Sequence, residues 1–243
     1  MDPQPFALLA CSVFEREVEL YAAGMTHLAE IRWYEIALHD RPDRLRAELQ
    51  GAVDELSARS DVGAVALLYG LCGLGTAGLR AGRVPLVLPR AHDCMTLFLG
   101  DRERYAQLQR ACPSCFWFSP GWNRARRVPG PDRLETLRAE LADRFDPEDA
   151  EYLVEMERSA WAQHDTAHFV DLGTADAEAE AAYAEGCARW LGWRFRRLPG
   201  DPGLLRDLLA GKWDAERFLV VHPGETIAHS PDDRIVRAEA GDR

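Results

Sequence analysis

Short apolar runs that alternate with helical segments constrain the fold of this chain most, because that order is typical of a parallel sheet with right-handed crossovers. In the first half of the chain the runs lie at residues 6–10, 31–37, 62–69 and 84–88, separated by segments whose apolar residues have helical spacing. The predicted fold class is therefore α/β. We expect two Rossmann-like halves of parallel sheet, with a cleft at the carboxyl edges of the strands.

A second alternating set follows a loop rich in proline and glycine. Strands are predicted at 115–118, 168–172, 193–198 and 218–221, and helices at 132–144, 147–163, 176–191 and 202–211. We therefore predict an N-terminal half over residues 1–110, which carries the site described below, and a C-terminal half over 111–229. Residues 230–243 are charged and lack apolar anchors, which predicts a flexible tail.

Three cysteines follow the apolar runs at the expected functional edge: Cys11 after the first run, Cys72 after the third and Cys94 after the fourth. The carboxyl ends of neighbouring parallel strands line one crevice, so these thiols are expected to converge. His39 or His92 would supply a fourth ligand. This set predicts a metal centre. Zinc is marginally preferred because Cys₃His fills its tetrahedral shell, and a [4Fe-4S] cluster is the alternative.

The loop that ends in Cys94 also carries the candidate catalytic residues Arg90, His92 and Asp93. Asp93 is placed to orient His92 or Arg90, and Arg90 is a candidate partner for an anionic substrate. A metal-free alternative uses the same residues. A histidine beside a cysteine lowers the pKa of the thiol and makes it a nucleophile.

Four further residues are predicted to contact the substrate. Arg102 and Arg104 begin a helix soon after that loop and can hold an anion. Trp122 belongs to an aromatic group that can wall a pocket. Gly73 opens a glycine-rich segment whose backbone amides can approach a bound group. This segment formally matches the dinucleotide fingerprint, but the next strand follows too soon for a helix, which argues against NAD.

Cys112 and Cys115 form a C-x-x-C pair, a spacing that also suits redox or metal chemistry. The redox motif opens a helix, whereas the aromatic residues after Cys115 predict a strand, and no second pair completes a zinc ribbon. The sequence therefore predicts that Cys72→Ser lowers the metal content and that Cys112→Ser does not. Cys187 lies in an alanine-rich helix and is predicted to be part of the core.

Composition excludes several classes of protein. The 243 residues include 40 acidic and 29 basic side chains, and the net charge of −11 opposes binding to nucleic acid. No apolar stretch approaches the roughly 20 residues that a membrane span requires, and the first residues carry no basic export segment. We expect a cytoplasmic protein, in which cysteines act as ligands, catalytic thiols or core rather than as disulfides.

Taken together, these motifs resemble those of one known family. The motifs are Ala10-Cys11, Leu38-His39-Asp40, Tyr69-Gly-Leu-Cys-Gly73, Pro89-Arg-Ala-His-Asp-Cys94, Gly100-Asp-Arg-Glu-Arg-Tyr105 and Gly121-Trp122. In this combination the chain resembles domain of unknown function 1638, a bacterial and archaeal family, from Phe6 to Val221. Cys112 and Cys115 depart from the family pattern, because relatives usually lack cysteine at these positions.

The resemblance supplies no reaction. Members of the family are often found in organisms that run corrinoid-dependent methyl transfer, which implies one-carbon or thiol chemistry and a corrinoid or methyltransferase partner. His92-x-Cys94 has the local form of the zinc ligands of thiol methyltransferases, which have a different fold. We therefore predict a metal-dependent transferase or lyase that acts on a small molecule. The alternatives are the metal-free cysteine enzyme and a non-enzymatic protein that handles a metal or a corrinoid.

Overall fold

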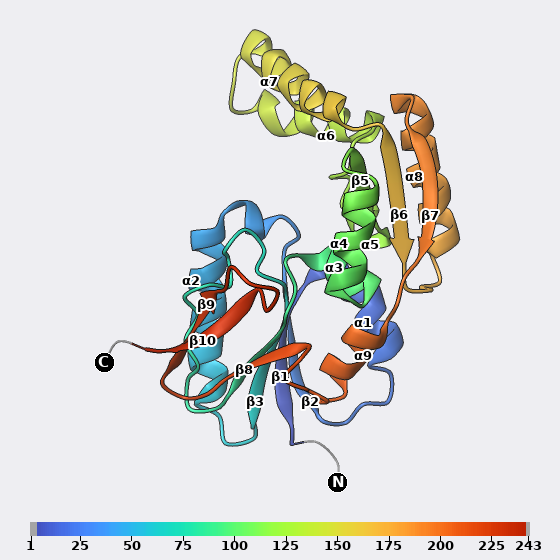
Figure 1. Ribbon diagram of the computed structural model, residues 1–243. Helices are drawn as coiled ribbons and strands as arrows, with labels where there is room; N and C mark the ends of the chain where they lie inside the picture. The colour runs from blue at the N-terminus through green and yellow to red at the C-terminus, as the bar shows by residue number, and fades with distance from the viewer. Residues whose placement is uncertain (1–3, 242–243) are drawn as a thin grey trace. The chain divides into compact units, whose positions relative to one another are not determined.

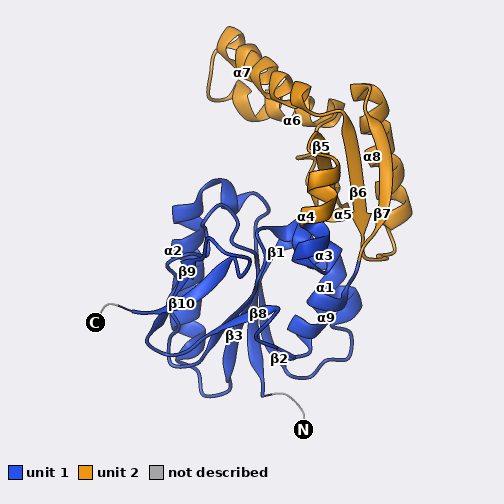
Figure 2. Cartoon of the chain, viewed as in Figure 1, with its two compact units in different colours: residues 1–105, 201–243 blue, residues 106–200 orange. Residues whose placement is uncertain are grey.

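The protein comprises two compact units, shown in different colours in Figure 2. A computed structural model describes residues 4–241. Unit 1 consists of Met1–Tyr105 and Asp201–Arg243, and unit 2 of Ala106–Gly200. Strands and helices alternate in both units, which confirms the predicted α/β class.

The main sheet of unit 1 has five strands in the order β2-β1-β3-β4-β8. These strands are β1 (Phe6–Cys11), β2 (Leu28–Tyr34), β3 (Ala64–Leu68), β4 (Leu86–Pro89) and β8 (Phe218–Val221). The first four pair in parallel, whereas β8 runs antiparallel to β4. Every residue of β1 and β3 is buried, as expected for apolar strands in a sheet that is covered on both faces.

Helices cover both faces of this sheet. The helices of unit 1 are η1 (Ser12–Phe14), α1 (Glu15–Tyr21), η2 (Leu38–Asp40), α2 (Pro42–Ser57), α3 (Cys94–Leu99) and α9 (Gly203–Leu209). Helix α4 (Arg102–Ala111) begins in unit 1 and continues into unit 2. Figure 1 shows α2 on one side of the sheet, with α1 and α9 on the other. A short helix, α3, precedes the helix predicted to begin near Arg102, because Gly100 ends α3 in the left-handed conformation with a φ of +77°.

The strand order creates a switch point between β1 and β3. From β1 the chain moves outward to β2, and it then crosses back to β3 and β4 on the opposite side of β1. Open sheets of this kind bind ligands outside the carboxyl ends of the strands at the switch point. Cys11 ends β1 there, and the loop that leads to Cys72 follows β3.

Unit 2 is built on a three-stranded parallel sheet in the order β5-β6-β7. Its elements are β5 (Cys115–Phe118), α5 (Pro120–Arg124), α6 (Pro131–Ala142), α7 (Pro147–Ala160), η3 (Trp161–Gln163), β6 (Thr166–Asp171), α8 (Ala177–Leu191) and β7 (Arg194–Pro199). One face of the sheet buries Ala167 and Phe169 against α8. Because side chains alternate along a strand, His168 lies on the other face.

The last part of the chain departs from the predicted boundaries. Residues 111–229 were expected to form one half, but α9 and β8 belong to unit 1 because β8 pairs with β4. The predicted flexible tail at 230–243 contains β10 (Val236–Ala240), which pairs with β9 (Glu225–His229). Ile235 and Val236 are buried, so the expectation of a loose tail was wrong.

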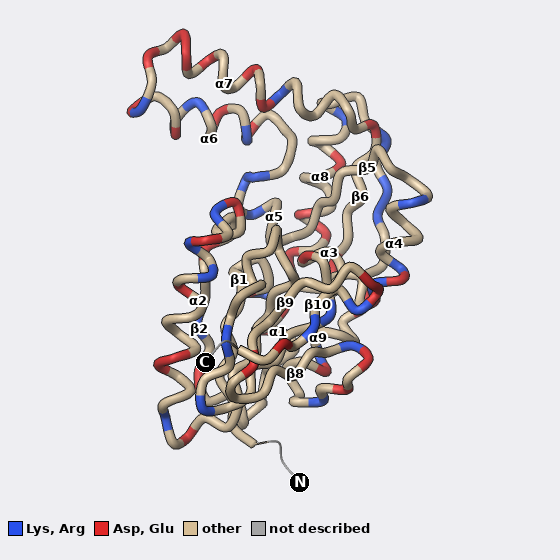
Figure 3. The backbone as a smooth tube through the Cα atoms, turned by 60° about the vertical axis from the view of Figure 1, so that its left-hand side comes forward, with Lys and Arg blue, Asp and Glu red and all other residues tan. Residues whose placement is uncertain are grey.

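Charged residues of both signs lie on the helices. Figure 3 shows acidic and basic residues interleaved along α6 and α7, whereas β1 carries none. In the part of the chain that the structure describes, no helix is long and apolar enough to cross a bilayer.

Candidate functional site

Two of the predicted ligand thiols interact at the carboxyl edge of the unit 1 sheet. Cys11 is only 7% exposed, and Cys72 is half-buried. Burial raises the pKa of the Cys11 thiol to about 11. Burial, with a smaller effect from Cys11, raises the pKa of the Cys72 thiol to about 12. Both thiols are therefore protonated at neutral pH, and neither is the low-pKa nucleophile that the metal-free alternative requires.

The other two predicted metal ligands lie on elements of the same unit. Cys94 is the first residue of α3 and is half-buried, and His39 lies in η2 with its Nε2 3.5 Å from the Asp40 carboxylate. Among residues 4–241, no metal-ligating group with all donor atoms within 4.8 Å of one another includes Cys11, Cys72, Cys94 or His39. The structure therefore does not assemble the ligand set predicted from sequence.

Gly73 lies in a tight turn after Cys72, with a φ of +62°. A Cβ added at this position would lie 3.9 Å from the carbonyl oxygen of His39, so the turn approaches η2 closely. Cys72 itself has a φ of +46°, a conformation that costs energy for any residue with a side chain. The glycine thus helps a strained loop to form at the switch point.

Asp93 caps α3 rather than orienting His92. Its Oδ1 accepts the backbone N–H of Met95 at 2.9 Å, and its Oδ2 accepts the hydroxyl of Tyr105 at 3.0 Å. The His92 side chain is exposed, while its backbone carbonyl accepts the N–H of Cys72 at 2.9 Å. A carboxylate at a helix N-cap stabilises the first turn, so Asp93 has a structural role here, and its catalytic role stays a prediction.

Arg90 holds the C-terminal segment in place, and its contact with an anionic substrate stays a prediction. The residue is 9% exposed, and its Nε donates to the carbonyl of Ala215 at 3.1 Å. Its Nη1 donates to the carbonyls of Arg234, at 3.3 Å, and Val236. These bonds tie the residue after β4 to the segment before β8 and to β10, because buried donors need acceptors.

The predicted substrate-binding side chains also make structural contacts, each within its own unit. Arg102 donates to the backbone carbonyl of Glu216 at 2.8 Å and pairs with its carboxylate. Arg104 donates to the carbonyl of Leu99 at 3.0 Å. Trp122, in α5, packs against the core of unit 2.

The metal-ligating group that the described residues do contain lies in unit 2. The ligand atoms of Cys112, Cys115 and His168 all lie within 4.8 Å of one another. Cys112 follows α4 and Cys115 begins β5, with a turn closed by the Cys115 N–H donating to the Cys112 carbonyl at 3.2 Å. Strand β6 pairs in parallel with β5 and brings His168 to the same group.

His168 is buried without a hydrogen-bond partner. The residue is 1% exposed, and neither ring nitrogen is bonded within the described part of the chain. Leaving such a polar group unsatisfied costs about 1–3 kcal/mol. Trp117 packs edge-on against the ring, with 5.1 Å between centroids. A metal ion on one ring nitrogen would compensate this cost, because neutral imidazole is a common metal ligand.

The surroundings favour the neutral imidazole of His168 and the protonated thiol of Cys115. Burial lowers the pKa of His168, and the positive charges of Arg196 and Arg194 lower it further. Burial raises the pKa of the Cys115 thiol to about 12, and Cys112 adds to the effect. A metal that binds there would displace thiol protons, so its affinity would rise with pH.

Gln109 of α4 contacts one thiol of this group and the tryptophan that packs against His168. Its Oε1 accepts the indole N–H of Trp117 at 2.9 Å and lies 3.8 Å from the Cys115 sulfur. Contacts of this kind hold metal ligands in one orientation. Three protein ligands leave one position of a tetrahedral ion open, which is typical of catalytic rather than structural zinc sites.

Sequence reasoning missed His168 because it stood alone, as the first residue of a predicted strand. The available signal was the C-x-x-C pair at the start of one predicted strand, together with a histidine in the next predicted strand. To recognise His168 as a candidate ligand from this signal, one must know that His168 pairs with Trp117, 51 residues earlier in the chain. Register between distant strands is set by packing rather than by local sequence.

The fold and this group of ligands define an α/β protein with a candidate Cys₂His metal centre. The family model described as "Protein of unknown function (DUF1638)" matches residues 33–209. The chain therefore belongs to this family, as its motifs predicted. No curated protein and no solved structure matches the chain.

The free energy of unfolding of the metal-free protein is expected to fall as the pH drops below about 6.5, the ordinary pKa of histidine. The folded state disfavours protonated His168, whereas the unfolded chain accepts the proton, so acid favours unfolding. The slope attributable to one such group approaches about 1.4 kcal/mol per pH unit. Urea unfolding followed by circular dichroism, at pH values above and below that pKa, measures it.

His168→Asn should remove the contribution of His168 to the pH dependence of the free energy of unfolding. His222→Asn is the matched control, because His222 is exposed, and it should keep the wild-type slope. Equal slopes in the wild type and in His168→Asn would contradict the assignment of a buried, neutral imidazole.

Proposed function

We propose that this protein is a metal-dependent protein that acts on a small anionic molecule, with its metal held by Cys112, Cys115 and His168. The observation that carries the proposal is a buried imidazole without a partner beside two thiols. Zinc is proposed first, because two cysteines, one histidine and an exchangeable fourth position match a known type of catalytic zinc site. A [4Fe-4S] cluster is the alternative, although the group offers fewer thiolates than such clusters use.

The chemistry proposed for this centre is that of a Lewis acid. A bound zinc ion would lower the pKa of a water or thiol in its open position and would polarise a substrate. This suits a transferase or lyase, including one-carbon transfer involving thiols, with a corrinoid or methyltransferase partner. We place the protein in the cytoplasm, where thiols stay reduced. A non-enzymatic carrier of metal or corrinoid is the alternative, and such a carrier would release its metal to an acceptor without turnover.

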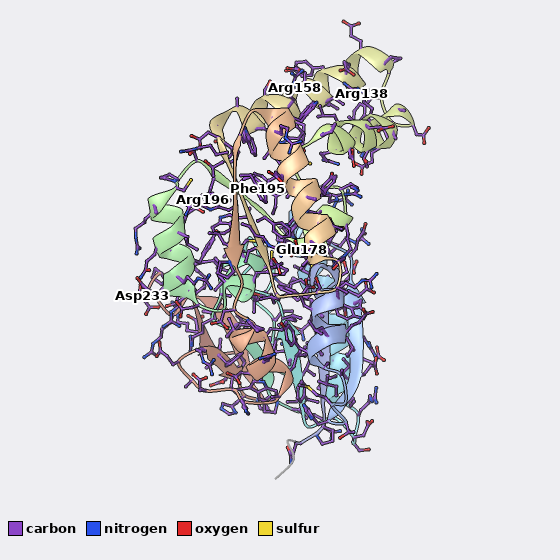
Figure 4. All side chains as sticks on the ribbon, turned by 90° about the vertical axis from the view of Figure 1, so that its right-hand side faces the viewer. Arg138, Arg158, Glu178, Phe195, Arg196 and Asp233 are labelled. Atoms are coloured by element: carbon purple, nitrogen blue, oxygen red, sulfur yellow. The ribbon has the colours of Figure 1, made fainter. Side chains whose placement is uncertain are left out.

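Arg196 supports an anionic ligand at the open position. It lies opposite His168 in the pairing of β6 with β7, so the two residues share a face of the sheet. Its neighbours Arg194 and Arg197 each pair with an aspartate at 3.1 Å. Arg196 is exposed and makes no ion pair within the described residues, and Figure 4 labels it on β7. An unpaired cation beside a metal favours a negatively charged ligand.

The switch point of the unit 1 sheet is a second candidate site. The hydroxyl of Tyr69 is buried there without a hydrogen-bond partner, and Tyr69 interacts electrostatically with Cys11 and Cys72. The strained conformation of Cys72 is of a kind that clusters at functional sites. We propose that a small molecule binds at this edge, as ligands do at the carboxyl ends of Rossmann-like strands, and that Cys94 and His39 belong to its surroundings.

The protein purified without oxygen is expected to contain about one zinc ion per chain by elemental analysis. Cys112→Ser and His168→Asn should each lower the metal content at least about tenfold, because each removes one of three ligands. Cys187→Ala is the matched control: Cys187 is a buried cysteine in α8 of the same unit and should leave the metal content unchanged.

The same measurement on Cys72→Ser separates the two candidate sites. We expect this variant to keep its metal. Loss of metal in Cys72→Ser together with retention in Cys112→Ser would contradict the unit 2 centre and restore the ligand set predicted from sequence.

The anionic ligand is tested by replacing zinc with Co²⁺, whose visible spectrum reports changes in its ligands. Acetate is expected to change that spectrum, and neutral acetamide to leave it unchanged. Arg196→Gln should weaken acetate binding about three- to tenfold, the range for one partly exposed ionic contact, and should retain the metal. Arg189→Gln is the control, because Arg189 is exposed on α8. Equal acetate affinity in the wild type and Arg196→Gln would contradict the anion assignment while leaving the metal assignment intact.

A further inference from the structure

Unit 2 contains a hollow of about 340 Å³ walled by aromatic side chains. It is lined by Arg158, Trp161, Ala162, Trp190, Leu191 and Trp193, which come from the end of α7, from η3, from the end of α8 and from the turn before β7. We propose that this hollow binds a flat aromatic molecule that carries a carboxylate. Its volume lies at the lower end of the range of small-molecule sites.

Two walls of the hollow are held in place by packing. Trp161 is buried in a small apolar core between α6 and α7. Trp193 meets the ring of His164 edge-on, with 5.7 Å between centroids, and lies 6.3 Å from the ring of Phe116. Walls that are already ordered reduce the entropy lost when a ligand binds.

Trp190 supplies an apolar surface that the protein itself leaves uncovered. It is 48% exposed, although exposing a large aromatic side chain to water is energetically unfavourable. Covering this surface stabilises a complex by about 25 cal/mol per Å² of apolar area. A flat ring is favoured, because aromatic pairs adopt offset-stacked or edge-to-face arrangements.

Three of the lining residues are tryptophans, whose indole N–H groups are hydrogen-bond donors. Trp117 and Trp213 donate theirs to acceptors of the protein at 2.9 and 3.0 Å. Trp161, Trp190 and Trp193 donate to no acceptor among the described residues. Donors without an acceptor in the protein favour a ligand with oxygen acceptors.

The charge at the rim selects an anion. The guanidinium of Arg158, labelled in Figure 4, lies 3.8 Å from the Glu155 carboxylate, and both side chains are about 60% exposed. Because this ion pair is long and exposed to solvent, it holds the Arg158 side chain weakly, and the guanidinium can reorient to bind a ligand. No lining residue is acidic. A planar guanidinium pairs well with a carboxylate, whereas it would repel a cationic ligand.

This proposal does not rest on the metal centre, because none of the lining residues is a proposed metal ligand. Its probe is 2-naphthoate, a flat bicyclic carboxylate, with neutral 2-naphthamide as the matched compound. Calorimetric titration of the full chain is expected to show binding of naphthoate, with naphthamide bound at least about threefold more weakly.

Two substitutions locate the binding. Trp190→Ala should weaken naphthoate binding at least about tenfold, as for the loss of an aromatic anchor. Arg158→Gln should weaken it about three- to tenfold and should leave naphthamide unchanged. Arg138→Gln and Trp33→Ala are the controls, because Arg138 pairs with Glu151 at 2.8 Å and Trp33 is an exposed indole of unit 1.

A second readout does not depend on any variant. The chain has seven tryptophans, and naphthoate should shift the indole N–H nuclear magnetic resonance signals of Trp161, Trp190 and Trp193, but not those of Trp33 and Trp213. Absence of naphthoate binding, or unchanged binding by Trp190→Ala, would overturn the site. Equal binding of naphthoate and naphthamide would overturn the anionic class of ligand.

Discussion

The parallel pairing of β6 with β5 and β7 is the constraint on which the candidate metal centre of unit 2 depends. This register places Trp117, His168 and Arg196 in one row across the sheet, with α8 packed on the opposite face. The turn between Cys112 and Cys115 ends where β5 begins, so the two thiols meet the imidazole without any long connection. Strand pairing and this turn together bring two thiols, one imidazole and one cation to the same face of the sheet.

In unit 1, strand pairing also brings polar residues to one edge of a sheet, but several of them make structural contacts. Its parallel strands deliver cysteine, histidine and arginine to one sheet edge, but several of these residues hold the fold together. Arg90 ties β10 to the chain after β4, and Asp93 caps α3. Charged residues in a loop at a functional edge are thus not evidence of catalysis by themselves, because buried backbone groups and helix ends require partners too.

Much of the fold was predictable because it depends on local patterns. The apolar runs identified strands β1, β3 and β5, and the helix predicted at 147–163 corresponds to α7 (Pro147–Ala160). What escaped prediction depends on contacts between distant segments. The return of β8 to β4 joins positions 129 to 135 residues apart. The order of the last described residues depends on the buried Ile235 and on the hydrogen bonds of Arg90. His168 as a candidate ligand belongs to this class, since its place beside Cys112 and Cys115 depends on the pairing of β5 with β6.

The most direct test of the central claim is X-ray absorption spectroscopy at the zinc edge of the purified full chain. We expect a shell of two sulfurs at about 2.3 Å and two nitrogen or oxygen atoms at about 2.0 Å, as for two cysteines, one imidazole and one exchangeable ligand. A shell of three or more sulfurs would point to the thiols of unit 1 and contradict this account. A protein that holds no metal at all would also contradict it.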